Sequence, residues 1–133
     1  MAKLLIVEDD ESVRTLSARA LERAGHTVDV ACDGAEGLET IRAAQGVYDL
    51  VVSDIRMPEM DGIEMAQAAA RAYPGLPILL MTGYADQRER AEELDAIIID
   101  VMQKPFTLAD IRDRVSLALV RASQSAPALA GVA

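Results

Sequence analysis

The sequence predicts an α/β fold with a parallel β-sheet, because short apolar runs alternate with patterns of helical period along the whole chain. Four of the apolar runs end in a chemically reactive polar group. They are residues 4–7 before Glu8-Asp9-Asp10, 50–53 before Asp54, 78–81 before Thr82, and 100–103 before Lys104. In a parallel sheet the carboxyl ends of the strands share one edge, where ligands bind. We therefore expect acids, a hydroxyl and a lysine to meet in one crevice.

Length and composition indicate one domain with an aliphatic core. The chain has 133 residues, 51% of them apolar, with one Phe, three Tyr and no Trp. This length is enough to bury a core, and the composition is ordinary for an α/β domain and argues against disorder. Leu, Ile, Val, Ala and Met must therefore fill the interior.

The formal net charge of −9 disfavours partners that demand a basic surface. We expect neither direct nucleic-acid binding nor docking on an anionic membrane. The chain starts on a strand pattern without a leader, and no apolar run approaches membrane-spanning length, which favours a cytoplasmic location. The single cysteine, Cys32, allows no disulfide within the chain and is expected to be a buried, inert thiol.

The first half of the chain is predicted as strand, helix, strand, helix. After the strand at residues 4–7, Ser12 can cap a helix whose apolar residues recur at helical spacing until Gly25 stops it. Residues 27–31 alternate like a strand, and Asp33 opens a second helix that ends near residue 45. Each helix is thus expected to connect two parallel strands.

The second half continues this alternation. In order come a strand at 50–53, a loop at 55–62, a helix at 63–73 and a strand at 78–81. Asp86 can cap a fourth helix, and the fifth strand is expected at 100–103. Thr107 with Asp110 resembles a capping box for the last helix. The total is five predicted strands and five predicted helices.

The acids at two strand ends predict a metal site. Glu8, Asp9 and Asp10 beside Asp54 would gather several carboxylates, which raise one another's pKa or recruit a cation. Oxygen ligands of this kind suit Mg²⁺. The triplet could instead be a solvated acidic turn or a helix N-cap. A carboxylate at the end of an apolar strand, by contrast, lacks a structural motive.

Asp54 is the expected centre of the chemistry. An aspartate can attack phosphorus and form an acyl phosphate. Such a transfer depends mainly on positioning and charge neutralisation, so Mg²⁺, the Lys104 ammonium and the Thr82 hydroxyl would each cover a phosphoryl oxygen. Alone, Lys104 could be a surface lysine and Thr82 a strand-end cap. Their joint placement at strand ends favours a phosphoryl site.

Four motifs in order carry a specific resemblance to a known family. They are Leu4-Leu5-Ile6-Val7-Glu8-Asp9-Asp10, Ser53-Asp54-Ile55-Arg56-Met57-Pro58-Glu59-Met60-Asp61-Gly62, Met81-Thr82-Gly83 and Lys104-Pro105-Phe106. With them the chain resembles the receiver domain of two-component response regulators over residues 2–121.

The resemblance implies a doubly wound, flavodoxin-like fold of five parallel strands in the order 2-1-3-4-5. It makes Asp54 the phosphoacceptor and one of the groups at the Mg²⁺ site. Asp9 would bind Mg²⁺ directly, Glu8 through a bound water, and Arg56 through its backbone carbonyl.

The resemblance also implies roles for the remaining strand ends. Thr82 and Lys104 would hold the phosphoryl group, and the Lys104-Pro105 peptide bond would be cis. The donor would be a histidine kinase or a histidine phosphotransfer protein of a phosphorelay. Phosphorylation would then switch binding of a downstream protein to the face formed by the fourth helix, fifth strand and fifth helix.

Two positions depart from the family pattern. Val101 stands where the family usually has a Tyr or Phe that swings inward, and Tyr84 is a possible substitute on the same face. Arg56 and Tyr84 occupy the positions that tend to tune dephosphorylation. Both side chains are bulky and could hinder an attacking water, so we expect slow self-hydrolysis of the phosphoaspartate.

The sequence predicts a receiver domain at residues 1–121 and a disordered tail at 122–133, which shows no periodicity. The tail is too short for an output domain such as a DNA-binding motif. The chain is therefore similar to single-domain response regulators, and more weakly to the alphaproteobacterial single-domain regulators of cell-cycle proteolysis. A piece of a longer regulator would have the same sequence pattern.

Two other functions remain as alternatives. A phosphatase of the haloacid dehalogenase type also uses a strand-end aspartate with Mg²⁺, but it needs a second aspartate where this chain has Arg56, which cannot donate a proton. A phosphate-independent interaction module would be expected to lose its acids, whereas Glu8, Asp9 and Asp54 are all retained.

Overall fold

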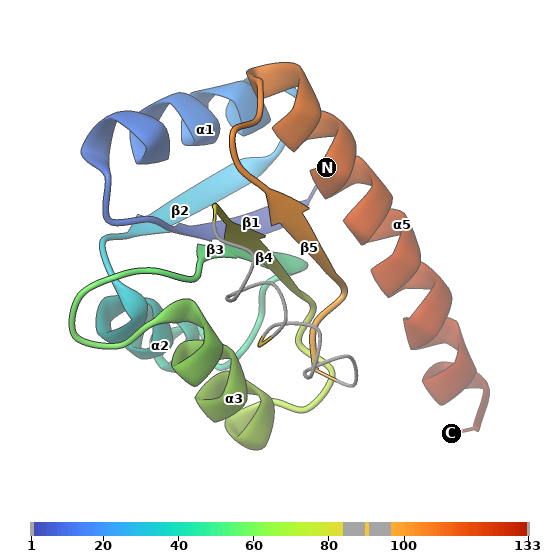
Figure 1. Ribbon diagram of the computed structural model, residues 1–133. Helices are drawn as coiled ribbons and strands as arrows, with labels where there is room; N and C mark the ends of the chain where they lie inside the picture. Colours follow the sequence, from blue (N-terminus) through green and yellow to red (C-terminus); the bar gives the residue numbers. More distant parts are fainter. Residues whose placement is uncertain (1, 84–89, 91–96, 133) are drawn as a thin grey trace.

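A parallel sheet forms the centre of the molecule. The structure, a computed structural model, describes residues 2–83, 90 and 97–132, with side chains up to residue 124. Five strands pair in the order β2-β1-β3-β4-β5, and all four pairings are parallel (Figure 1). The predicted strand order is therefore confirmed.

Strands and helices alternate along the chain. The strands are β1 (Lys3–Val7), β2 (Thr27–Ala31), β3 (Leu50–Asp54), β4 (Ile78–Thr82) and β5 (Asp100–Gln103). The helices are α1 (Glu11–Arg23), α2 (Gly34–Ala43), α3 (Gly62–Ala72) and α5 (Leu108–Val132). The chain goes from β1 to β2 on one side and then to β3 on the other, so the topological switch point lies between β1 and β3.

Helices cover both faces of the sheet. Helices α1 and α5 lie on one face, and α2 and α3 lie on the other (Figure 1). Strand β1 shows how the sequence builds both layers: Leu4 and Ile6 join the cluster under α1 and α5, while Leu5 and Val7 join the cluster under α2 and α3. Alternate side chains of one strand thus serve two cores.

Strands β3 and β4 hold two residues of the site in buried positions. Every residue of β3 and of β4 is buried, as expected for strands covered on both faces. Because these strands end in Asp54 and Thr82, two polar side chains are held at the sheet edge with only 7% and 1% exposure. Such burial of a carboxylate requires partners.

The helix caps partly match the prediction. Thr107 and Asp110 form the expected reciprocal bonds, at 2.9 Å from Thr107 N to Asp110 Oδ2 and 3.0 Å from Asp110 N to Thr107 Oγ1. The prediction of Ser12 as the first cap is wrong. Helix α1 begins at Glu11, and Asp10 caps it by accepting a 3.0 Å hydrogen bond from Val13 N. An aspartate in extended backbone just before the first turn is the better-placed acceptor.

One further expectation differs from the structure. Cys32 is exposed rather than buried, because it follows the last residue of the edge strand β2, where the chain turns into the N-cap of α2. Helix α5 continues to Val132, although Pro127 and Gly131, two poor helix formers, lie in its last turns. The disordered tail at residues 122–133 and the domain boundary at residue 121 stay predictions.

The predicted fourth helix, capped by Asp86 and containing Ala91 and Leu94, lies outside the described residues apart from Arg90. The fifth strand begins at Asp100, as predicted. Within the described part of the chain, no helix is both long and apolar enough to span a membrane.

Candidate functional site

Four strand ends meet at one edge of the sheet. Glu8 follows β1, Asp54 and Thr82 are the last residues of β3 and β4, and Lys104 follows β5. Glu8 and Thr82 are each 1% exposed and Asp54 is 7% exposed. Glu8 and Asp54 flank the switch point between β1 and β3, where open α/β sheets form a crevice.

Local backbone geometry holds the Asp54 carboxylate in place. Its Oδ1 accepts a 2.9 Å hydrogen bond from Ile55 N. The chain then loops and returns at Gly62, whose N donates 2.8 Å to the carbonyl of Ile55. A Cβ on Gly62 would overlap the Asp54 carbonyl oxygen. Glycine is therefore required for the chain to return so close behind the carboxylate.

Lys104 bridges the two buried acids. Its Nζ lies 3.0 Å from Glu8 Oε1 and 3.0 Å from Asp54 Oδ2. Lys104 N also donates 2.7 Å to the carbonyl of Thr82, and the Lys104-Pro105 bond is cis, as the resemblance implies. The lysine side chain is 28% exposed, so its two ion pairs with the buried carboxylates are partly open to solvent.

The acids form a group that could hold a cation. One carboxylate oxygen from each of Glu8, Asp9 and Asp54 lies within 4.8 Å of the others. Burial and the neighbouring Asp54 raise the pKa of Glu8, against the opposing effect of Lys104. Burial and then Glu8 raise the pKa of Asp9. Acids that resist ionisation beside one another are stabilised by added positive charge.

Lys104 supplies part of that charge. Burial lowers the pKa of its ammonium, but the hydrogen bonds and charges of Asp54 and Glu8 outweigh burial, and the pKa is raised overall. Lys104 is therefore a cation at neutral pH. Asp10 stands apart from the acid group, because its side chain caps α1. The predicted triplet thus divides into a cap and two site residues.

Comparison with known proteins identifies the family. The family model of the response regulator receiver domain matches residues 4–116 of this chain. The chain belongs to this family. Receiver domains are signalling domains of two-component systems and not classical enzymes.

Two relatives of this receiver differ in how much of their own length it matches. It is 37% identical over 121 residues to the response regulator MprA of Mycobacterium sp. (strain KMS), covering 91% of this chain and 52% of MprA. It is 35% identical over 122 residues to the response regulator receiver protein CpdR of Brucella abortus (strain 2308), covering 92% of this chain and 100% of CpdR. The chain thus spans about half the length of the first curated relatives and the whole of CpdR.

Solved structures agree with this fold. The chemotaxis response regulator CheY4 of Vibrio cholerae matches with a TM-score of 0.79 and 30% identity, over 89% of this chain and 98% of that one. The flavodoxin-like receiver fold implied by the motifs is therefore confirmed.

A cavity of about 570 Å³ opens beside the acids of this receiver. Its lining residues are Val13, Asp54, Arg56, Gly83, Lys104, Pro105 and Phe106. Arg56 is exposed and also lines a smaller neighbouring cavity with Asp9. Arg56 thus borders both cavities, and its role in tuning dephosphorylation stays a prediction.

Of the two positions predicted for the switch, Val101 and Tyr84, the structure describes only Val101. Val101 is 7% exposed and packs in the core under α2 and α3. Tyr84 lies outside the described residues, so its role as a substitute aromatic stays a prediction.

Sequence reasoning assigned no role to three residues of the site region. Gly62 belongs to the motif around Asp54, and Val13 to the apolar pattern of the first helix, but neither pattern indicates a role at the site. Phe106 was noted only beside the lysine. Val13, in α1, and Phe106, in the loop between β5 and α5, are both partly exposed, and neither exposure has a local sequence signal.

Proposed function

We propose that this receiver is a Mg²⁺-dependent phosphoacceptor that takes a phosphoryl group from phosphohistidine onto Asp54 and thereby changes its binding to a partner protein. The main support is the convergence around Asp54. Its carboxylate has one oxygen 3.0 Å from the Lys104 ammonium, with the acids Glu8 and Asp9 alongside and an open cavity above.

The acid group fits a hard divalent cation. Its donors are all carboxylate oxygens close enough to share one ion, and Mg²⁺ uses one or two carboxylates and keeps waters. Glu8, Asp9 and Asp54, with the Arg56 backbone carbonyl, would hold it. Bound there, Mg²⁺ supplies positive charge against the phosphoryl oxygens.

Asp54 acts as the nucleophile in this proposal. One carboxylate oxygen forms a bond to phosphorus while the bond from phosphorus to the donor nitrogen breaks, and the electron pair leaves with the ring. The Lys104 ammonium donates a hydrogen bond to the same carboxylate, and a small movement of its side chain would bring it to a phosphoryl oxygen. The buried Thr82 hydroxyl is held on the neighbouring strand end, within the same edge. Catalysis is then positioning and charge neutralisation.

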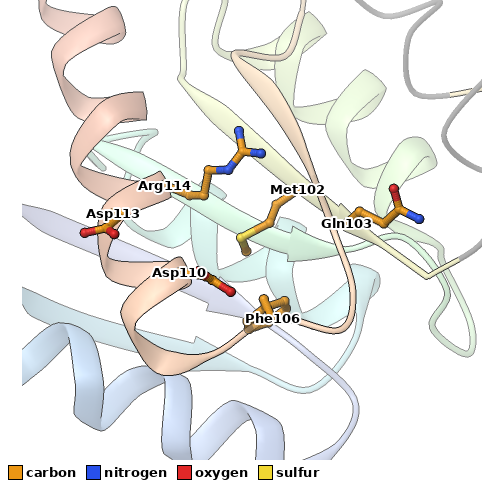
Figure 2. A pocket seen from close by; sticks show the side chains of 6 residues that line it. All are labelled: Met102, Gln103, Phe106, Asp110, Asp113 and Arg114. Atoms are coloured by element: carbon orange, nitrogen blue, oxygen red, sulfur yellow. The ribbon is translucent and has the colours of Figure 1, made fainter.

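The proposed output surface is the one that the family resemblance implies. Phosphorylation would bias the face formed by the predicted fourth helix, β5 and α5 between two arrangements. On this face a cavity of about 470 Å³ lies between β5 and the start of α5 (Figure 2). Because Val101 has no ring to turn inward, the signal has to pass through other residues of this face.

The donor and target are proposed by class. A histidine kinase or histidine phosphotransfer protein supplies phosphohistidine, and a downstream protein reads the altered face. The match over the whole of CpdR, a response regulator receiver protein, supports a single-domain receiver. The half-length match to MprA supports the alternative of a receiver within a longer regulator.

Intact-protein mass spectrometry tests the proposal. Acetyl phosphate or phosphoramidate should add one phosphoryl mass in the presence of Mg²⁺ and none after chelation. Asp54→Asn should abolish the addition, and Asp113→Asn, an exposed aspartate on α5, should retain it.

The rival functions give different results in the same experiments. A phosphate-independent module would gain no phosphoryl mass from small donors or from a phosphohistidine protein. A phosphatase would turn over p-nitrophenyl phosphate, and we expect no turnover.

A further inference from the structure

The cavity beside Asp54 has a polar end and an apolar wall. Asp54 and Lys104 lie at the polar end. The apolar wall comes from Val13, in the first turn of α1, and from Pro105 and Phe106, in the loop between β5 and α5. About 570 Å³ is within the range of ligand clefts, roughly 300–1,000 Å³.

Phe106 is the aromatic member of this wall. Among the described residues that line the cavity, it alone has an aromatic ring. The ring is partly buried, packs against the core under α1 and α5, and also borders the second cavity beside Met102 and Asp110 (Figure 2). It is therefore anchored by the core while part of its surface remains open to the cavity.

The reaction geometry decides what lies against this wall. In an in-line displacement on phosphorus, the leaving group departs on the side away from the nucleophile. With Asp54 as nucleophile on one side of the cavity, the leaving group would lie farther into the same space, which Val13, Pro105 and Phe106 also line. A planar heterocycle gains from contact with an aromatic face or edge, whereas ammonia gains nothing there.

We propose that Phe106, supported by Val13, is a donor-specificity residue that packs on the imidazole ring of the phosphohistidine donor. This inference rests on the proposed phosphoacceptor function and deepens it. The ring contact holds phosphorus in line with the Asp54 oxygen, because a well-positioned reactant reacts faster than a freely tumbling one. In the step itself the P–N bond breaks, the electron pair goes to the ring nitrogen, and the P–O bond to Asp54 forms.

Two small donors isolate the ring contact. Phosphoimidazole and phosphoramidate both transfer a phosphoryl group by breaking a P–N bond, but only phosphoimidazole has a ring. The measurement is the apparent second-order rate constant of each, with saturating Mg²⁺, followed by intact mass on the full chain. The ratio of phosphoimidazole to phosphoramidate rate constants is the readout, because any distortion of Asp54 or Lys104 slows both donors together.

Phe106→Ala is expected to lower this ratio about three- to tenfold, the range that one aromatic contact provides. Val13→Ala should lower it less, and Phe106→Tyr should keep it near the wild-type value. Tyr73→Ala is the matched control. It removes a partly buried ring at the end of α3, at the opposite edge of the sheet, and should leave the ratio unchanged.

An unchanged ratio in Phe106→Ala would overturn the inference, even if both rates fall. Equal loss of the ratio in Tyr73→Ala would do the same, because the effect would then not be local. If the wild type takes no phosphoryl group from either small donor or from a phosphohistidine protein, the proposed function itself fails. The two failures are therefore distinguishable.

Discussion

The ammonium nitrogen of Lys104 lies 3.0 Å from Oδ2 of Asp54, although 50 residues separate the two in the sequence. The same nitrogen lies 3.0 Å from Glu8 Oε1. Lys104 thus balances two buried carboxylates on adjacent strands. A divalent cation bound here would therefore compete with the lysine for the same two carboxylates.

Lys104→Met should therefore separate charge balance from phosphoryl transfer. Loss of the ammonium leaves Glu8 and Asp54 unbalanced, so the Mg²⁺-free protein should lose about 1–3 kcal/mol of unfolding free energy, less than the ~3–5 kcal/mol of a fully buried pair because the lysine is 28% exposed. Mg²⁺ affinity should rise, since a competitor for the acids is gone, while phosphorylation slows. Calorimetric titration measures the Mg²⁺ affinity, and urea unfolding measures the stability. Lys3→Met, at the other lysine of the chain, is the control. Weaker Mg²⁺ binding in Lys104→Met would contradict this competition.

The Mg²⁺ site should distinguish two adjacent aspartates. Asp9→Asn removes a member of the acid group and should weaken Mg²⁺ binding at least as much as the ~10–100-fold loss typical of outer-shell partners. Asp10→Asn keeps a capping oxygen for α1 and should leave Mg²⁺ binding within a small factor of wild type. The rise of the melting temperature with Mg²⁺ concentration reports the affinity. Equal losses in the two variants would place the ion elsewhere.

The strand-end positions could be predicted because they depend on periodicity and on the single carboxyl edge of a parallel sheet. Asp54, Thr82 and Lys104 each follow an apolar run, and the fold brings them together. The side-chain pairing within the site could not be predicted from the sequence. Whether Lys104 pairs with Glu8, with Asp54 or with solvent depends on side-chain conformations and on burial, and neither has a local sequence signal.

The missed features have the same physical origin. Asp10 and Ser12 are both acceptable cap residues, and only the backbone conformation at Asp10 selects it. Cys32 is a residue type that is usually buried, but its position just beyond an edge strand exposes it. Phe106 sits between two cavities, a property of the surrounding elements rather than of its own segment.

Tyr48 should make stability fall at alkaline pH. Its hydroxyl donates 2.7 Å to Asp29 Oδ2, and burial, then that hydrogen bond, raise its pKa above the ordinary value of 10.0. The folded state keeps the proton at pH values where the unfolded state loses it, so this contribution is complete below pH 10 and declines above it. Tyr48→Phe should cost about 1 kcal/mol at neutral pH. Urea unfolding from pH 8 to 11 should show the wild-type advantage over Tyr48→Phe shrinking above pH 10, and a constant advantage would refute the assignment.

Gly62 should tolerate no side chain. A Cβ there would overlap the Asp54 carbonyl oxygen, so Gly62→Ala has to displace the backbone behind the carboxylate. We expect a loss of about 2 kcal/mol or more in stability, together with slower phosphorylation. Gly83→Ala is the control for stability, because among the described residues beyond its chain neighbours the added Cβ would meet only Lys104 Cβ at 3.9 Å, an ordinary contact. Similar thermal stability of Gly62→Ala and wild type would show that the return loop is freer than this geometry requires.

Arg56 should set the lifetime of the phosphoaspartate. Arg56 is exposed and lines the cavity that Asp54 also lines, so we expect its side chain to hinder the approach of a water toward phosphorus. Arg56→Ala should open this approach and shorten the lifetime several-fold, and Arg56→Ala with Tyr84→Ala should shorten it further. Arg71→Ala, an exposed arginine in the last turn of α3, removes the same bulk and charge far from the site and should have no effect. The lifetime is read from the decay of the phosphorylated mass after the donor is removed by desalting in Mg²⁺ buffer. If the Arg56→Ala, Tyr84→Ala double variant decays at the wild-type rate, side-chain bulk does not limit hydrolysis in this receiver.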